Sequence, residues 1–200
     1  MHGVPFTPDL EPTRLLTAYA NGIFPMDVDG ELCWFSPDPR AILPLDAFHV
    51  PRTLRQVVRQ GRFEIRVDGD FAAVILACAE RPIEQTWISE EIVAAYTRLH
   101  ELGFAHSVEA WRDGELAGGL YGVALGGAFF GESMFHRRRD ASKAALVALV
   151  ERMKARGFSL LDVQWPTPHL RRFGVIEVPR REYLRRLRAA LLLKCDFRAI

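Results

Sequence analysis

Three polar side chains interrupt two apolar stretches of this 200-residue chain. Glu132 lies in "GGAFFGESMF" (126–135), and Asp162 and Gln164 lie in "SLLDVQ" (159–164). Both stretches have the composition of β-strands. A carboxylate that is buried without partners is costly, so each acidic residue here needs a hydrogen-bonding partner or a ligand. The spacing of Asp162 and Gln164 places both side chains on one face of their strand.

These three polar side chains would meet if the two strands are neighbours in one sheet. Glu132 is expected to share its face with Phe130 and Met134. The polar groups would then converge on an apolar pocket, which is the usual form of a small-ligand site. For each residue alone, a purely structural role is an equal alternative, in which the buried polar side chain is fully hydrogen-bonded and ties strand ends together. The whole set favours a functional site over that alternative.

The elements that would carry these residues follow from periodicity, caps and turns. The first part of the chain predicts a helix at 12–21, a hairpin at 27–36 with Asp29-Gly30 as its turn, a basic helix at 51–61, a strand at 63–70 and an apolar helix at 70–80. A helix capped by Ser89 follows. After it come three antiparallel strands, a helix, two strands and an arginine-rich helix, at 105–112, 116–125, 127–135, 141–157, 159–164, 174–180 and 181–193.

This order of elements predicts an α+β fold. It matches the succession of the GNAT acyltransferase fold, so we expect a small mixed α/β N-terminal subdomain at residues 1–85 and a GNAT-like acyltransferase domain at 86–200. Acyl-CoA users of that fold hold pyrophosphate in a glycine-rich loop before the helix predicted here at 141–157. Residues 136–146, "HRRRDASKAAL", contain no glycine. This departure argues against acetyl-CoA and for another acyl donor.

Arginine is concentrated in a few segments although the formal net charge is only +1. The three clusters are 52–62, 136–143 and 171–188. Arginine makes planar, bidentate contacts with phosphate and carboxylate groups. The clusters therefore suggest an anionic partner such as a nucleic acid, and the alternative is a set of solvated helix faces.

The remaining composition is that of a globular protein, with 49% hydrophobic residues. Cys33, Cys78 and Cys195 are odd in number and far apart, which favours a reducing compartment over a disulfide framework. No apolar run reaches the roughly 18 residues of a membrane span, and no signal peptide is expected at the start. We therefore expect a cytoplasmic protein with no membrane contact. The histidines show no metal-ligand spacing, so no metal is expected.

Several long motifs of this chain resemble one bacterial family. They include "AYANGIFPM", "WFSPDPRAILPL", "TWISEEIVAAYTRLHELGFAHSVEAW", "LAGGLYGVALGGAFFGESMF" and "DASKAAL". "LLDVQ" followed by "HL", "FGV" and "VPRREYL" completes the series, and the motifs keep their order from about residue 12 to residue 188. In these motifs the chain resembles the leucyl/phenylalanyl-tRNA–protein transferases.

The resemblance implies an aminoacyltransferase. It would transfer leucine or phenylalanine, with methionine left open, from aminoacyl-tRNA to the N-terminal Arg or Lys of proteins. The products would then pass through the adaptor ClpS to the Clp protease, by the N-end rule of protein degradation. An aminoacyl ester is already activated, so no cofactor is expected, and the chain is expected to act as a monomer.

The resemblance also implies roles for individual residues. Asp162 and Gln164 occupy the positions of the family's proposed catalytic pair, in which Gln164 accepts or steers the proton of the attacking amine. Glu132 would lie at the aminoacyl-adenosine end of the pocket, where it would hold the donor's α-ammonium group or its ribose. The donor side chain would be bound by an apolar set: Leu120, Phe129, Met134, Leu146, Leu149 and Leu161.

Other positions would contact the tRNA. Trp87 occupies the position that stacks on the terminal adenine in the family. Met26 stands where the family usually has tryptophan, and Trp34 offers a further aromatic surface for stacking. The basic helix would bind phosphates of the acceptor stem rather than its bases, through Arg52, Arg55 and Arg59.

Two other functions remain open from the sequence. One is a GNAT-type N-acyltransferase that uses CoA or a carrier protein, which the missing glycine loop disfavours. The other is a tRNA-end binding module without turnover, which the retained set of Glu132, Asp162 and Gln164 disfavours. Whether Gln164 or the ribose 2′-hydroxyl handles the proton also stays open.

Overall fold

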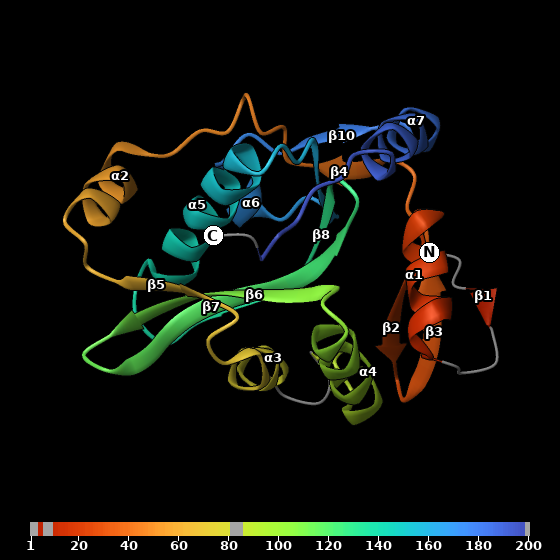
Figure 1. The fold of residues 1–200 in the computed structure, drawn as a ribbon, viewed down its shortest axis with the longest axis horizontal. Helices are drawn as coiled ribbons and strands as arrows, with labels where there is room; N and C mark the ends of the chain where they lie inside the picture. Colours follow the sequence, from red (N-terminus) through yellow and green to blue (C-terminus); the bar gives the residue numbers. More distant parts are fainter. Residues whose placement is uncertain (1–3, 6–9, 81–85, 199–200) are drawn as a thin grey trace.

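A seven-stranded sheet forms the centre of the structure (Figure 1). The computed structural model describes residues 4–5, 10–80 and 86–198. From edge to edge the strands are β10 (Ile176–Val178), β4 (Arg40–Ile42), β9 (Leu160–Gln164), β8 (Ala128–His136), β7 (Glu115–Leu125), β6 (Ala105–Arg112) and β5 (Glu64–Val67). Strands β8 and β9 are parallel, and the other neighbours are antiparallel. The two strands that carry Glu132, Asp162 and Gln164 are therefore neighbours, which is the condition for these side chains to meet.

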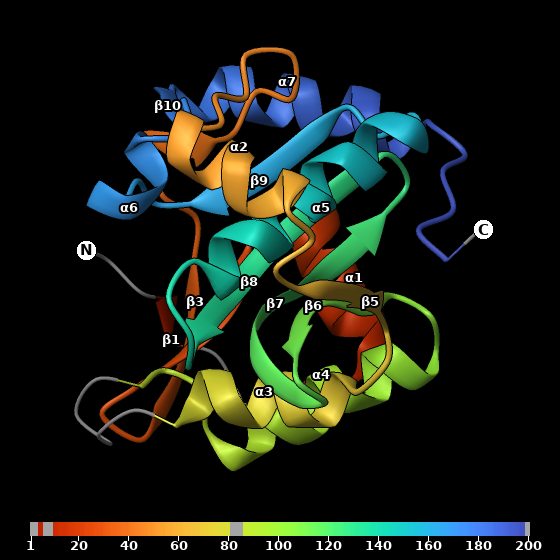
Figure 2. The ribbon, with the colours of Figure 1, turned by 90° about the vertical axis from the view of Figure 1, so that its left-hand side faces the viewer.

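Helices cover both faces of this sheet (Figure 1). Helix α5 (Ala141–Ala155) lies on one face with α2 (Arg52–Arg59) beside it, as the turned view also shows (Figure 2). Helices α3 (Phe71–Ala79) and α4 (Glu90–Glu101) lie on the opposite face. The remaining helices are α1 (Pro12–Ala20), the short α6 (Pro168–Arg171) and α7 (Arg180–Leu191). The two faces of the sheet thus carry two separate hydrophobic cores.

A second, three-stranded sheet has the order β1 (Val4–Pro5), β3 (Glu31–Phe35) and β2 (Phe24–Val28). Strands β2 and β3 form the predicted hairpin. Its turn residues Asp29 and Gly30 have positive φ values of 56° and 83°, the conformation that favours Asp-Gly in tight hairpins. The same dipeptide joins β6 to β7, where Asp113 has φ 55° and Gly114 has φ 79°.

The predicted helices and strands agree with the structure, with three omissions, of which strand β1 is only two residues long. Strand β4 is only three residues long and lies in a segment rich in proline, so the sequence pattern did not reveal it. Helix α6 lies between the strands predicted at 159–164 and 174–180, where no element was predicted. The predicted domain boundary falls at residues 81–85, outside the described residues, and stays a prediction. Strands β4 and β5 come from before that boundary and pair with strands from after it.

A β-bulge at Glu132 changes which residues share a face. Gly122 of β7 pairs with Gly131 and Tyr121 pairs with Ser133, so Glu132 is the extra residue of strand β8. Phe130 therefore belongs to one hydrophobic core, whereas Met134 packs against the other. The expectation that Phe130 and Met134 lie on the same face was wrong, because a bulge shifts the alternation of the strand by one residue.

The bulge generates a prediction about Gly122. A β-carbon built at Gly122 would lie 2.2 Å from the carbonyl oxygen of Phe130 and 2.5 Å from the ring of Phe129. Gly122→Ala should therefore lower the free energy of unfolding by at least about 1–3 kcal/mol, measured by urea denaturation. The matched control is Gly131→Ala, whose β-carbon would lie 3.5 Å from its nearest neighbour. Equal stability of the two variants would contradict this role for Gly122.

Candidate active site

Glu132 and Gln164 contact each other at the point where strands β8 and β9 stop pairing. The last paired residues are Phe130 and Asp162. Two residues farther along, the side-chain Nε2 of Gln164 donates a hydrogen bond to Oε1 of Glu132, at 3.0 Å. Gln164 has φ 60°, in the left-handed region that residues other than glycine rarely adopt. Such strain persists only where the surroundings impose it, and it is frequent at functional sites.

Asp162 lies directly behind this pair and is fully buried. Its carboxylate accepts hydrogen bonds from Arg40 Nε (2.9 Å), Arg40 Nη2 (2.6 Å), the Tyr183 hydroxyl (2.7 Å) and the backbone N–H of Gln164 (2.9 Å). These four donors occupy the lone pairs of both oxygens. Asp162 thus holds the backbone of Gln164 in place.

Arg40 is the functional neighbour that sequence reasoning missed. Its side chain is 1% exposed, and its guanidinium also donates to the carbonyl oxygen of Gly22 at 3.1 Å. The guanidinium carbon lies 4.7 Å from the ring centres of both Phe24 and Tyr183, a cation–π arrangement. The signal in the sequence was a single arginine before the apolar residues of "RAILPL". Its partner, Asp162, is 122 residues away, so no local pattern could identify it.

Glu132 has an unusual protonation behaviour. Burial is the main cause that raises the pKa of its carboxyl group to about 8, and the charge of Asp162 acts in the same direction. Hydrogen bonds from tyrosines and the charge of Arg40 oppose the rise. The Tyr96 hydroxyl donates to Oε2 of Glu132 at 3.5 Å and is hydrogen-bonded to the Tyr19 hydroxyl. The carboxyl group therefore exchanges its proton near neutral pH, where such exchange is useful in catalysis.

An apolar cavity of about 340 Å³ opens beside Glu132 and Gln164. This volume lies within the usual range for small-ligand pockets. Most of the predicted set lines it, as do side chains that were not predicted. The predicted lining residues are Trp87, Leu120, Met134, Leu146, Leu149 and Leu161, and the additional ones include Tyr121, Val163, Trp165, Thr167, His169 and Leu170.

Three residues of the predicted substrate set lie away from the cavity wall. Phe129 is fully buried beneath it, with its ring 5.0 Å from that of Phe197. Met26 and Trp34 lie in the three-stranded sheet, on β2 and β3. That sheet reaches the cavity through Trp165, whose ring lies 5.1 Å from that of Phe24 on β2. A tryptophan directly after Gln164 was the available signal for this link.

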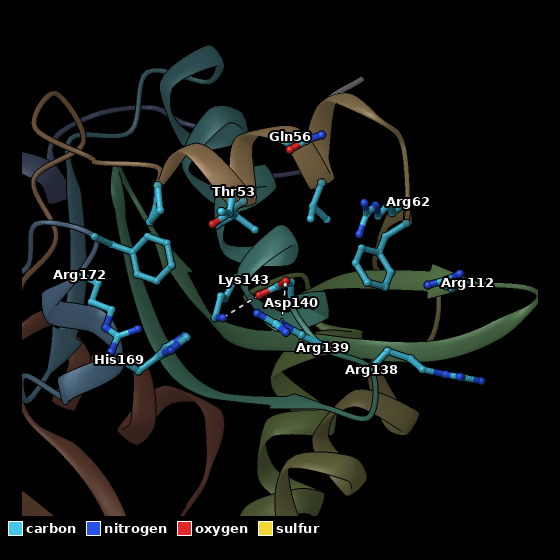
Figure 3. Close-up of a pocket in the computed structure, with 15 residues that line it drawn as sticks. Thr53, Gln56, Arg62, Arg112, Arg138, Arg139, Asp140, Lys143, His169 and Arg172 are labelled. Atoms are coloured by element: carbon cyan, nitrogen blue, oxygen red, sulfur yellow. Dashed lines mark hydrogen bonds and ion pairs between the residues drawn. The ribbon is translucent and has the colours of Figure 1, made fainter.

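A second, basic cavity of about 520 Å³ adjoins the first, since His169 lines both. We call it the basic pocket. It lies between α2, the start of α5 and the segment of α6 (Figure 3). Its charged and titratable lining residues are Arg62, Arg112, Arg138, Arg139, Asp140, Lys143, His169 and Arg172. The predicted tRNA-binding residues of α2 do not line this pocket and are exposed on the helix: Arg52, Arg55 and Arg59.

Metal sites and membrane-spanning helices are both absent from the part of the chain that the structure describes. That part contains no group of three or more His, Cys, Asp or Glu side chains placed to hold a metal ion. None of its helices has the length and apolar character needed to cross a membrane.

Comparison with known proteins gives one consistent match. Residues 8–38 match the model of the leucyl/phenylalanyl-tRNA protein transferase N-terminal domain, and residues 42–188 match the model of leucyl/phenylalanyl-tRNA protein transferase. The chain is 55% identical over 192 residues to a leucyl/phenylalanyl-tRNA–protein transferase of Herpetosiphon aurantiacus, covering 96% of this chain and 100% of that protein. It is 57% identical over 190 residues to the transferase of Rubrobacter xylanophilus, covering 94% and 98%.

The fold has a counterpart among solved structures. A GCN5-related glucosamine N-acetyltransferase region in a fungal multi-domain GH3 β-N-acetylglucosaminidase aligns with a TM-score of 0.51 and 14% identity. The alignment covers 88% of this chain and 23% of that one. At this identity the likeness concerns the fold alone, and it confirms the predicted GNAT-like architecture.

The ion pair behind the site generates a prediction about stability. Arg40→Met would leave the buried Asp162 carboxylate without its main partner, which typically costs about 3–5 kcal/mol of folding free energy. Urea denaturation of Arg40→Met should show that loss. Arg98→Met is the control, because Arg98 forms an exposed ion pair with Glu101 at 2.7 Å, and such pairs contribute about 1 kcal/mol or less. A loss no larger than that of the control would contradict the structural role of Arg40.

The raised pKa of Glu132 generates a prediction about pH. The folded protein holds the Glu132 proton more tightly than the unfolded chain between about pH 4.5 and about pH 8, so stability from this group falls as pH rises through that window. Glu132→Gln removes this dependence. The variant should gain stability relative to the parent between about pH 5 and about pH 9 in urea denaturation. If the difference in stability between Glu132→Gln and the parent does not change with pH, or changes in the opposite direction, burial does not raise the pKa of Glu132.

Proposed function

Because the chain belongs to the leucyl/phenylalanyl-tRNA–protein transferase family, we propose that its apolar cavity binds the aminoacyl end of leucyl- or phenylalanyl-tRNA. The site transfers that amino acid to the N-terminal Arg or Lys of a protein. The observation that carries this proposal is the hydrogen-bonded pair of Glu132 and Gln164 at the wall of a leucine-lined cavity. Such a pair offers a cation-binding group and an amine-orienting group beside one apolar pocket.

The reaction needs orientation more than activation. The amine nitrogen of the acceptor attacks the carbonyl carbon of the ester that joins the amino acid to the ribose of the terminal adenosine. A C–N bond forms, the C–O ester bond breaks, and one amine proton ends on the departing ribose oxygen. The ester is already activated, so the reaction proceeds without a cofactor or a covalent intermediate. Holding the two reactants in alignment supplies much of the acceleration.

Gln164 orients the attacking amine. Its Nε2 is engaged by Glu132, so its Oε1 is the atom that accepts a hydrogen bond from the amine. A carboxamide is a poor base, and Gln164 therefore directs the amine while the ribose 2′-hydroxyl offers a route for the proton. Asp162 does not line the cavity and acts through Gln164, whose backbone N–H it fixes.

Glu132 binds the α-ammonium group of the donor. An α-ammonium group near its carboxylate favours the ionised form, which offsets the rise in pKa that burial causes. The apolar wall then receives the donor side chain. Unbranched and γ-branched side chains fit such a wall, whereas β-branched ones are excluded by shape.

The tRNA itself is bound by residues around the cavity. Trp87, which lines it, stacks on the terminal adenine. Met26 and Trp34 belong to the same adenine subsite and act through the three-stranded sheet. The acceptor stem lies along α2, where its phosphates meet Arg52, Arg55 and Arg59.

The cellular setting follows from this reaction. The protein acts in the cytoplasm as a monomer, and its products pass through ClpS to the Clp protease. Residues 1–85 act as a small subdomain for tRNA contacts, and residues 86–200 form the catalytic domain.

The proposal predicts a specific transfer. The protein should move radiolabelled leucine from leucyl-tRNA to a peptide that begins with Arg, and should leave a peptide that begins with Ala unlabelled. Gln164→Ala should lower kcat by about 10²–10³-fold, because it removes a group that acts on the attacking amine. The Kd for tRNA should change little.

Acetyl-CoA serves as the competing donor in the same assay. Label transferred only from acetyl-CoA would identify a CoA-dependent N-acyltransferase, the second candidate. Binding of tRNA without transfer would identify a binding module. An equal loss of kcat and tRNA affinity in Gln164→Ala would remove Gln164 from the reacting centre.

A further inference from the structure

The basic pocket is a feature that the reaction described above does not use. Figure 3 shows cationic side chains from several elements around the pocket, with Arg172 on one side, Arg112 on the other and Arg138 extending outward. Arg62 follows α2, Arg112 ends β6, Lys143 lies in the first turn of α5, and Arg172 follows α6. Asp140 is the one carboxylate among the residues that line the pocket. Cations gathered this closely from distant parts of the chain repel one another unless an anion joins them.

The carboxylate partners of the arginines are weak, whereas Lys143 pairs with the partly buried Asp140 at 2.7 Å. Arg139 has a 94% exposed side chain, and its ion pair with Asp140 is 3.7 Å long. Arg138 pairs with the exposed Glu115 at 3.3 Å. Exposed pairs of this kind contribute about 1 kcal/mol or less, so a stronger anion displaces them at small cost. Arg62 donates from its Nε to the neutral side chain of Gln60.

The basic pocket is continuous with the apolar cavity. His169 lines both, and its Nε2 is buried without a hydrogen-bond partner among the described residues. Burial, with the charges of Lys143, His136 and Arg172, lowers the pKa of His169. The imidazole is therefore neutral, and it separates an uncharged cavity from a positively charged one. A ligand that spans the two must be apolar at one end and anionic at the other.

We propose that the basic pocket binds the phosphate groups of the single-stranded 3′ end of the donor tRNA, next to the terminal adenosine. This inference rests on the proposed function, and it assigns the path by which the RNA strand leaves the apolar cavity. Each nucleotide before the adenosine brings one phosphate, and arginine contacts phosphate in a bidentate manner. The acceptor protein is a poor occupant, because its N-terminal Arg or Lys is cationic and the pocket repels it.

The pocket and the exposed arginines of α2 occupy different sides of that helix. Thr53, Leu54 and Val57 line the pocket, whereas Arg52 and Arg55 do not. Two strands of RNA can therefore meet one helix. The paired acceptor stem contacts the outer arginines, and the single strand passes along the inner side.

The first test measures how tRNA binding depends on salt. The triple variant carries Arg138→Gln, Arg139→Gln and Lys143→Gln. For a single strand, each lost phosphate contact makes the negative slope of log K against log salt shallower by about 0.7. The magnitude of the slope should therefore decrease by about 2 in this variant. Arg172→Gln tests the other side of the basic pocket by itself and should decrease the magnitude of that slope by about 0.7. An unchanged slope in both variants would overturn the proposal.

Arg98→Gln is the matched control. Arg98 and Arg138 have the same 58% side-chain exposure, and each pairs with one glutamate. Arg98 lies on α4, on the other face of the sheet from α5 (Figure 1). It should keep the parental slope. A loss in Arg98→Gln equal to that in the triple variant would show general surface attraction and would overturn the assignment to the pocket.

The second test separates phosphate binding from catalysis. Leucyl-adenosine carries the reacting ester but no phosphate, so the ratio of kcat/KM for leucyl-tRNA to kcat/KM for leucyl-adenosine should fall at least about 10-fold in the triple variant. An unchanged ratio would overturn the proposal. A rise in the KM of the acceptor peptide with an unchanged donor ratio would assign the pocket to the acceptor protein instead. If the parent transfers from neither donor while the salt slopes change as expected, the proposed function fails and the RNA site stands.

Discussion

The rest of the structure depends on the buried ion pair between Arg40 and Asp162. Neither charge is stable in an apolar interior alone, and the pair is tolerated because every hydrogen-bonding position of the carboxylate is used. The pair also connects distant parts of the fold. Arg40 binds the turn at Gly22 before the small sheet, and Tyr183 brings in helix α7. Strand β9, which carries Gln164, is therefore fixed from the small sheet, from a neighbouring strand and from a helix at once.

Two irregularities of the backbone then turn a sheet into a site. Strands β8 and β9 pair only as far as Phe130 and Asp162, and the apolar cavity opens beyond that point. On one strand the bulge places Glu132 as an extra residue, and on the other Gln164 adopts a left-handed conformation. Their side chains bond across the opening that the backbones leave. In a regular sheet the two strands would stay paired, and no ligand could approach from between them.

Much of this arrangement could be predicted from local sequence patterns. The Asp29-Gly30 turn and the Ser89 cap each depend on residues a few positions apart, and each was predicted correctly. The apolar lining could be predicted for the same reason, apart from Phe129, which lies one layer too deep. The bulge could not, because it is a feature of how β8 pairs with β7 and no local pattern in β8 marks it. Arg40 could not either, because its meaning depends on a partner 122 residues away. The expectation that Asp162 and Gln164 both face the pocket was wrong for Asp162, because only Gln164 lines the cavity and its left-handed backbone interrupts the alternation of β9.

Electrostatics divides the two neighbouring cavities by what each can hold. The apolar one is dry enough to shift the proton equilibrium of Glu132, so it favours a ligand end with a single cation and an apolar side chain. The basic one retains positive charge because the ion pairs of Arg138 and Arg139 are exposed and weak, and Asp140, which also pairs with Lys143, is the one carboxylate in its lining. An aminoacyl-tRNA carries these two kinds of group in the same order, from the amino acid to the first phosphates. A free amino acid satisfies only the first cavity, and an unrelated RNA strand only the second. The proposed recognition of the whole donor thus rests on the adjacency of two sites that are each unselective alone, with the neutral His169 between them.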